Sequence, residues 1–167
     1  MYRTSVPFAT DLPSDVDLDA VLAGVRDDHV SAPADVDDEL VQIADRARAD
    51  GLSLSIVVID KNPRHDSQLR DLATDVGRTE HGTVLVLSPD WVGTYSDSIS
   101  RVRLEGAEDA AKYTGGESVV AAQRFVDDLE TPYVSWTAIT CLMLACTAFL
   151  VAGLYLVKAG RARSRAS

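Results

Sequence analysis

LSLSIVVID, at residues 52–60, and TVLVL, at residues 83–87, are the two stretches that decide the fold of this chain. The first begins as an apolar/polar alternation and becomes continuously apolar, and the second is apolar after its first residue, which is typical of strands covered on both faces. Between them Leu69, Leu72 and Val76 recur at helical spacing. A strand, a helix and a strand joined by short loops predict a right-handed βαβ unit with two parallel strands.

The segments on either side of this unit extend it into a layered domain. A weaker strand is predicted at 91–95, paired as a hairpin after Pro89-Asp90. Further helices are predicted from amphipathic stripes at 18–25, 36–47, 98–113 and 119–129. We therefore predict an α/β fold, a three-layer sandwich in which a small, centrally parallel sheet is flanked by helices.

Local signals predict where some of these helices begin and end and which side chains they bury. Asp35 is a suitable N-cap for the helix at 36–47, and Gly51 follows that helix where a left-handed residue is favoured. In the helix at 98–113 we expect Ile99, Val102 and Leu104 to point inward.

A long apolar run near the C-terminus predicts one transmembrane helix, at 136–157. The 24 residues from Val134 to Val157 carry no formal charge. A helix of that length spans about 36 Å, against about 30 Å for the hydrocarbon core of a bilayer. Trp136 and Tyr155 stand near its two ends, where aromatic rings favour the headgroup level.

The charges that flank this run predict its orientation. Lys158, Arg161, Arg163 and Arg165 follow it, and acidic residues precede it. The positive-inside bias then places the C-terminus in the cytoplasm and the N-terminal domain outside. Residues 1–30 show neither a basic n-region nor an apolar h-region of a signal peptide, which favours the alternative of a tail anchor with a cytoplasmic domain. We expect the first arrangement.

These patterns divide the chain into five parts. They are an N-terminal lead-in with a short helix (1–30), an α/β domain (31–130), a short tether (131–135), the transmembrane helix (136–157) and a basic tail (158–167). Because the tether is short, we expect the domain to stay close to the membrane surface.

The net charge of the chain limits the classes of partner that it can bind. The net charge is −10, and the four cations after Trp136 account for +4, so the rest carries −14. This acidic balance argues against nucleic-acid binding, because phosphate binding needs a basic face. The acidity fits solubility, a cationic partner or a divalent metal. Cys141 and Cys146 lie inside the apolar run, so the domain has no thiol for catalysis or metal binding.

Carboxylates supply the candidate metal ligands. Asp35 and Asp38 belong to an acidic cluster that could hold Ca²⁺ or Mg²⁺, although acidic residues also stabilise the start of a helix. Asp60 and Asp90 follow the two buried strands, where ligands bind in parallel sheets, although such residues also cap turns. The chain shows no phosphate-binding glycine loop, zinc motif or catalytic triad pattern, which favours a function without catalysis.

An acidic helix start (ADVDDELVQIADRARADG), the strands LSLSIVVID and GTVLVLSP, and the helix SRVRLEGAEDAA occur in this order before the apolar run. In this the chain resembles the TPM-domain family, and it looks like single-pass membrane proteins of mycobacteria and corynebacteria related to that family. The resemblance implies an accessory or assembly module at the cell envelope. Its partners would be the lipid bilayer and an envelope or membrane protein. A metal-dependent acid phosphatase and a Ca²⁺-binding structural domain are the alternatives that the resemblance implies.

Overall fold

The computed structural model describes residues 12–13, 15–131 and 136–164. Within the last of these ranges, side chains are described for 139–154 and Lys158. The chain divides into two compact units, Met1–Thr131 and Pro132–Ser167. The predicted tether at 131–135 lies, apart from Thr131, outside the described residues.

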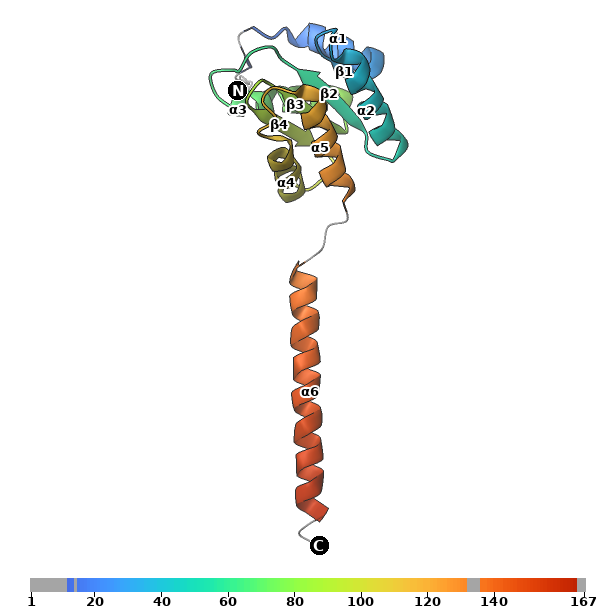
Figure 1. Ribbon diagram of the computed structural model, residues 1–167, viewed down its shortest axis with the longest axis vertical. Coiled ribbons are helices and arrows are strands. Elements are labelled where there is room, and N and C mark those ends of the chain that lie inside the picture. Colours follow the sequence, from blue (N-terminus) through green and yellow to red (C-terminus); the bar gives the residue numbers. More distant parts are fainter. Residues whose placement is uncertain (1–11, 14, 132–135, 165–167) are drawn as a thin grey trace, which may run out of the picture. The chain divides into compact units, whose positions relative to one another are not determined.

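In the first unit helices and strands alternate from α1 to β3, and β4 and two helices follow (Figure 1). Its elements are α1 (Leu18–Asp28), β1 (Val30–Ser31), α2 (Asp37–Ala49), β2 (Leu54–Val58), α3 (Ser67–Glu80), β3 (Thr83–Leu87), β4 (Val92–Ser96), α4 (Arg101–Ala111) and α5 (Ser118–Glu130). The second unit holds α6 (Trp136–Ser164). The described part of the chain is thus a mixed α/β structure, as predicted.

The sheet has four strands in the order β1-β2-β3-β4. β1, β2 and β3 are parallel, and β4 is antiparallel to β3. Ile56 of β2 lies opposite Leu85 of β3, which in turn lies opposite Thr94 of β4. The βαβ unit with two parallel strands and the hairpin that follows it are therefore confirmed.

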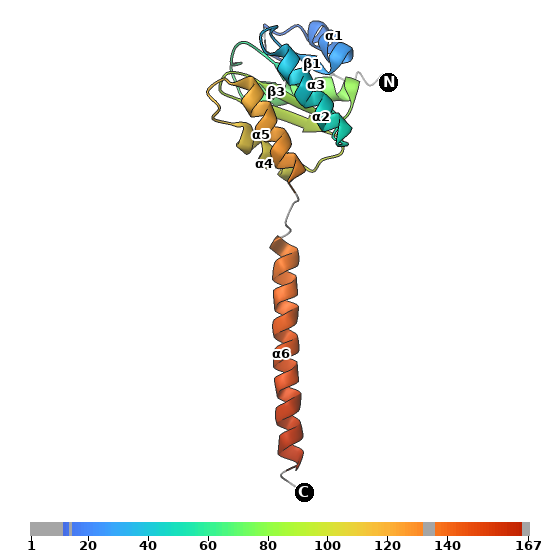
Figure 2. The same ribbon diagram turned by 45° about the vertical axis from the view of Figure 1, so that its right-hand side comes forward.

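Helices cover both faces of the sheet and give two cores (Figure 2). On one face α1 and α3 pack on Val57 and Val84. On the other, α2, α4 and α5 pack on Ile56 and Leu85, with Phe125 of α5 fully buried. Successive strand residues thus belong to opposite cores, as the two-residue period of a strand requires.

Three local predictions need correction. No strand was predicted between the helices expected at 18–25 and 36–47, but Val30 and Ser31 form β1 and pair with β2. The N-cap of α2 is Val36 and not Asp35, and no side-chain hydrogen bond caps that helix. Val102 is 72% exposed because Leu104 and Ala107 form the buried face of α4. Gly51 does adopt the expected left-handed conformation, with φ of 94°.

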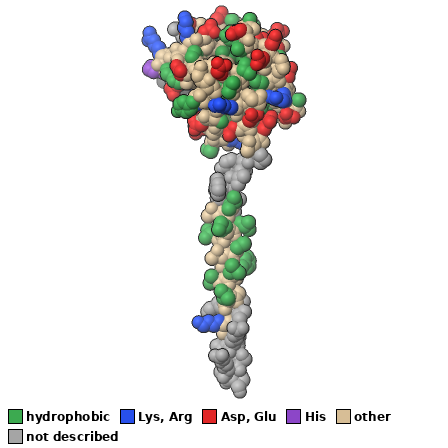
Figure 3. All heavy atoms as spheres, viewed as in Figure 1, with side chains coloured by type: hydrophobic (Ala, Val, Ile, Leu, Met, Phe, Trp, Pro, Cys, Tyr) green, Lys and Arg blue, Asp and Glu red, His purple; other side chains and the backbone are tan. Residues whose placement is uncertain are grey.

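α6 differs from the other helices in its surface. Large apolar side chains are exposed along its described part: Ile139, Leu142, Met143, Leu144, Phe149, Leu150, Val151 and Leu154. Figure 3 shows these apolar side chains along the helix, whereas Asp and Glu are scattered over the α/β unit. The predicted span at 136–157 falls on α6. Among the residues that the structure describes, no helix is long and apolar enough to cross a membrane.

Candidate ligand pocket

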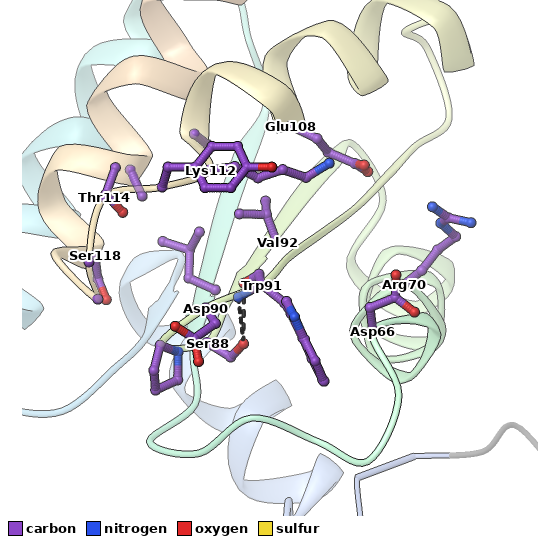
Figure 4. Close-up of a pocket in the computed structure, with 17 residues that line it drawn as sticks. Asp66, Arg70, Ser88, Asp90, Trp91, Val92, Glu108, Lys112, Thr114 and Ser118 are labelled. Atoms are coloured by element: carbon purple, nitrogen blue, oxygen red, sulfur yellow. Dashed lines mark hydrogen bonds between the residues drawn. The ribbon is translucent and has the colours of Figure 1, made fainter.

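A cavity of about 650 Å³ opens at the carboxyl end of β3 (Figure 4). It is enclosed by the β3–β4 turn, the start of α3, the end of α4, the α4–α5 loop and the start of α5. Its lining residues are Asp66, Arg70, Leu87, Ser88, Pro89, Asp90, Trp91, Val92, Glu108, Ala111, Lys112, Tyr113, Thr114, Gly115, Gly116, Ser118 and Ala121. Ligands of open α/β sheets bind at this end of the strands, and the volume suits a small molecule or one side chain of a partner.

A hydrogen-bond network fixes the β3–β4 turn on one side of the cavity. The side-chain carbonyl oxygen of Asn62 accepts from the Ser88 hydroxyl at 2.9 Å and from the Asp90 backbone N–H at 3.0 Å. The Asn62 amide donates to the Asp90 carboxylate. The Trp91 backbone N–H donates to the Ser88 hydroxyl oxygen at 3.2 Å. Asp90 and Trp91 are therefore held in place by the loop after β2.

The opposite wall carries a buried acid, Glu108 of α4, whose side chain is 5% exposed. Its Oε1 accepts a hydrogen bond from the Thr94 hydroxyl and lies 3.6 Å from Nη2 of Arg101. That Nη2 atom is itself buried and has no hydrogen-bond partner among the described residues. The pair is therefore an ion contact without a hydrogen bond.

Lys112 follows Glu108 by one helical turn and lines the same wall. Its ammonium group lies 2.7 Å from the carboxylate of Asp109. The hydrogen bond to Asp109 raises the pKa of Lys112 above its usual value, and this outweighs the opposing effect of burial. The charges of Asp109 and Glu108 also favour the charged form of Lys112.

The loop after α4 closes the cavity with an unusual backbone. Tyr113 has φ of 62°, and Gly115 and Gly116 have φ of 65° and 87°. Glycine adopts this region freely, but a tyrosine there is uncommon. The Tyr113 side chain is also 95% exposed, so burial does not offset its backbone conformation.

Comparison with known proteins places the chain in a family. Residues 11–167 match the family described as membrane protein Rv1476. The chain belongs to the Rv1476 membrane protein family. It is 43% identical over 145 residues to membrane protein Rv1476 of Mycobacterium tuberculosis (strain ATCC 25618 / H37Rv), an alignment that covers 86% of this chain and 77% of that protein. No solved structure matches the chain.

The four carboxylates predicted as metal ligands are distributed over separate places in this Rv1476 family member. Asp90 lines the cavity. Asp60 lines another hollow, of about 470 Å³, together with Asp15 and Asp17. Asp35 and Asp38 are exposed near the start of α2. In the part of the chain that the structure describes, no three His, Cys, Asp or Glu side chains are grouped as ligands of one metal ion. A role of these four residues in metal binding stays a prediction.

Sequence reasoning missed most of the residues that line the cavity of the Rv1476 family member. Arg70, Glu108, Lys112 and Tyr113 come from three separate segments, and each alone looks like an ordinary helix or loop residue. One usable signal was the spacing of Leu104, Ala107, Glu108 and Ala111, which puts a glutamate on the buried face of α4. A buried acid among apolar residues needs a partner, which marks the position for attention.

Proposed function

We propose that the chain is a single-pass membrane protein in which α6 anchors an extracytoplasmic, non-catalytic interaction module. The observation that carries this proposal is the exposure of the apolar side chains of α6, from Ile139 to Leu154. Each exposed Leu or Phe forgoes about 1.5–3 kcal/mol of burial free energy in water. A bilayer would recover this energy over the whole uncharged run at 134–157.

The family supports the same proposal, because the Rv1476 family is described as a membrane protein family. The four cations at 158–167 favour a cytoplasmic C-terminus, and so an extracytoplasmic domain. Only the four residues 132–135 separate Thr131 from the start of α6. The five Cα–Cα steps from Thr131 to Trp136 reach at most about 18 Å, so the α/β unit would work close to the bilayer surface.

The cavity supports binding over catalysis. The Ser88 hydroxyl donates to Asn62 and also accepts from Trp91, so it serves the turn and not a reaction. Asp90 is held by the Asn62 amide. The alternatives, a metal-dependent phosphatase and a Ca²⁺-binding domain of the TPM type, would need Asp35, Asp38, Asp60 and Asp90 to act from separate places. A tethered module that recognises a membrane or envelope protein fits the geometry better.

Alkaline carbonate extraction of membranes tests the anchor. The full chain should stay in the pellet, whereas the double variant Leu144→Arg/Leu150→Arg should be released. An arginine at the centre of a spanning helix costs about 2.5–3.5 kcal/mol on the translocon insertion scale. The matched control, Val102→Arg/Val120→Arg, places two arginines at exposed positions of α4 and α5 and should stay in the pellet. Release of the unmodified chain would refute the anchor.

A further inference from the structure

We infer that the cavity at the carboxyl end of β3 binds an organic cation, namely the ammonium or guanidinium group of a basic side chain on a partner. This inference rests on the proposed function and deepens it by naming the chemistry of the partner. Three features of the cavity support this inference. They are the net charge of its lining residues, the aromatic side chains that line it, and a buried carboxylate with one oxygen free for a donor.

The charges of the lining favour a cation. Asp66, Asp90 and Glu108 oppose Arg70 and Lys112, which leaves one net negative charge. Lys112 is paired with Asp109 at 2.7 Å and also interacts with Glu108, which has an ion contact with Arg101. In the view of Figure 4 the Arg70 guanidinium points away from Trp91. The whole chain carries −10, so its field attracts cations and repels anions.

Two aromatic residues line the cavity from separate segments. Trp91 belongs to the β3–β4 turn and Tyr113 to the α4–α5 loop. The faces of both rings are electron-rich and attract ammonium and guanidinium groups. Tyr113 is almost fully exposed in an uncommon backbone conformation. A cation against its ring would give the exposed side chain a contact that the folded domain does not provide.

Glu108 supplies a specific acceptor. Among the described residues its contacts to Thr94 and Arg101 both involve Oε1. Its Oε2 is therefore free for a donor, although the side chain is only 5% exposed. A hydrogen bond from a charged donor to a buried carboxylate is among the stronger ones in proteins. An entering ammonium or guanidinium group would supply a hydrogen bond to Oε2.

The cavity and the exit of the chain toward α6 lie at opposite ends of α5. Ser118, at the start of α5, lines the cavity, whereas the chain leaves for α6 after the end of the same helix. The 13 residues of α5 separate these two points by about 20 Å. The cavity therefore opens at the end of the domain away from Thr131.

Fluorescence of Trp91 in the full-length chain tests this inference. The chain has two tryptophans, so Trp136→Phe makes Trp91 the single reporter. In uncharged detergent micelles it would be titrated with N-acetyl-lysinamide and N-acetyl-argininamide. N-acetyl-glycinamide is the neutral control and inorganic phosphate the anionic one. A saturable change with the two cations only is expected. n-Butylammonium, compared with a Gly-Gly-Lys-Gly-Gly peptide, separates a free amine from a side chain, and tighter binding of the peptide is expected.

Matched variants locate the site. Tyr113→Gly removes the ring and suits the backbone, and should weaken binding about two- to fivefold, as expected for one exposed cation–π contact. Tyr113→Phe keeps the ring and should leave binding within about twofold. Glu108→Gln should weaken binding about tenfold or more, because it removes a charge-assisted hydrogen bond. Glu39→Gln, at an exposed position of α2, should have no effect.

Four results would overturn the inference. Among the probes they are saturation by phosphate and not by the cations, no saturation by any probe, and tighter binding of n-butylammonium than of the peptide. Among the variants it is an equal response of Tyr113→Gly and Glu39→Gln. None of these results would change carbonate extraction of the same protein. Failure of the cation site is therefore distinguishable from failure of the membrane anchor.

Discussion

The guanidinium group of Arg103 in α4 donates a hydrogen bond to the backbone carbonyl oxygen of Thr131 at 2.9 Å. The same Nη2 atom also donates to the carbonyl oxygen of Leu129. These carbonyls stand at the end of α5, whose last turn holds no basic residue of its own. Arg103 thus stabilises the C-terminal end of α5 from a neighbouring helix, at the last described residue of the α/β unit.

Removal of this contact should weaken the α/β unit. Arg103→Ala leaves the carbonyls of Leu129 and Thr131 without their charged donor, which should cost about 1–2 kcal/mol. For a domain of this size that corresponds to a fall of about 4–8 °C in the melting midpoint. Arg124→Ala, an exposed position of α5, should change the midpoint by less than about 2 °C. Equal midpoints of the two variants in thermal melts of the full chain would show that the Arg103 contact is dispensable.

Close packing of α3 against β4 depends on Gly93. A Cβ at Gly93 would lie 2.6 Å from the backbone carbonyl carbon of Leu69 and 2.7 Å from the backbone nitrogen of Arg70. Since these are backbone atoms, Gly93→Ala must displace α3 and should cost about 2–3 kcal/mol. Urea unfolding measures this loss. A variant as stable as the unmodified chain would show that α3 is not held as closely as the structure has it.

Substitution of Gly106 by alanine is the matched test, and it should raise the free energy of unfolding where Gly93→Ala lowers it. Gly106 lies inside α4, and a Cβ there would come no closer than 3.8 Å to another residue, at a carboxylate oxygen of Asp128. Gly106→Ala should therefore stabilise the domain by about 0.5–1 kcal/mol, because alanine loses less backbone entropy in a helix. A destabilised Gly106→Ala in the same urea experiment would mean that α4 is more crowded than described.

Asp37 should make stability depend on pH. Burial, followed by the charges of Asp28 and Asp38, raises the pKa of Asp37 above its usual 3.8. The folded state then holds this proton more tightly than the unfolded chain does. The stability that comes from protonated Asp37 is therefore present below pH 3.8. It is lost as the pH rises through the raised pKa that Asp37 has in the folded state. At neutral pH the charged carboxylate is left in an unfavourable environment.

Asp37→Asn should for this reason raise the melting midpoint at pH 7 in low salt. Solvent screening limits the gain to about 1 °C. At pH 3 the difference between variant and unmodified chain should vanish, because Asp37 is then neutral in both states. Thermal melts at the two pH values, with Asp38→Asn alongside, measure this. A gain that persists at pH 3 would assign the effect to something other than the charge of Asp37.

The central part of the fold follows from local sequence patterns. The runs at 52–60 and 83–87 predicted both buried parallel strands because they are long and apolar enough to need cover on two faces. β1 could not be predicted in the same way. It has two residues, too few for any period, and it is a strand because β2 offers Ile56 and Val57 as partners.

Contacts between segments far apart in the sequence determine which residues are buried and where the cavity forms, and local sequence patterns could not predict either. Val102 was expected to be buried, but α4 packs through Leu104, Ala107 and Ala111. The two alanines have small side chains that give a weak hydrophobic signal. The cavity is formed in the same way, by the approach of the α4–α5 loop to the β3–β4 turn. Of the predicted site residues it includes Asp90, which could be placed because it follows a strand of the βαβ unit directly.

The central claim is that α6 spans the membrane once, with the α/β unit outside and the basic tail inside. After Cys141→Ala and Cys146→Ala, the only two cysteines are gone, so single cysteines can be introduced by Asp109→Cys in the domain or by Ser167→Cys in the tail. A membrane-impermeant maleimide applied to intact cells should label the first, and should label the second only after permeabilisation. Labelling of both positions in intact cells, or of the tail alone, would contradict the account.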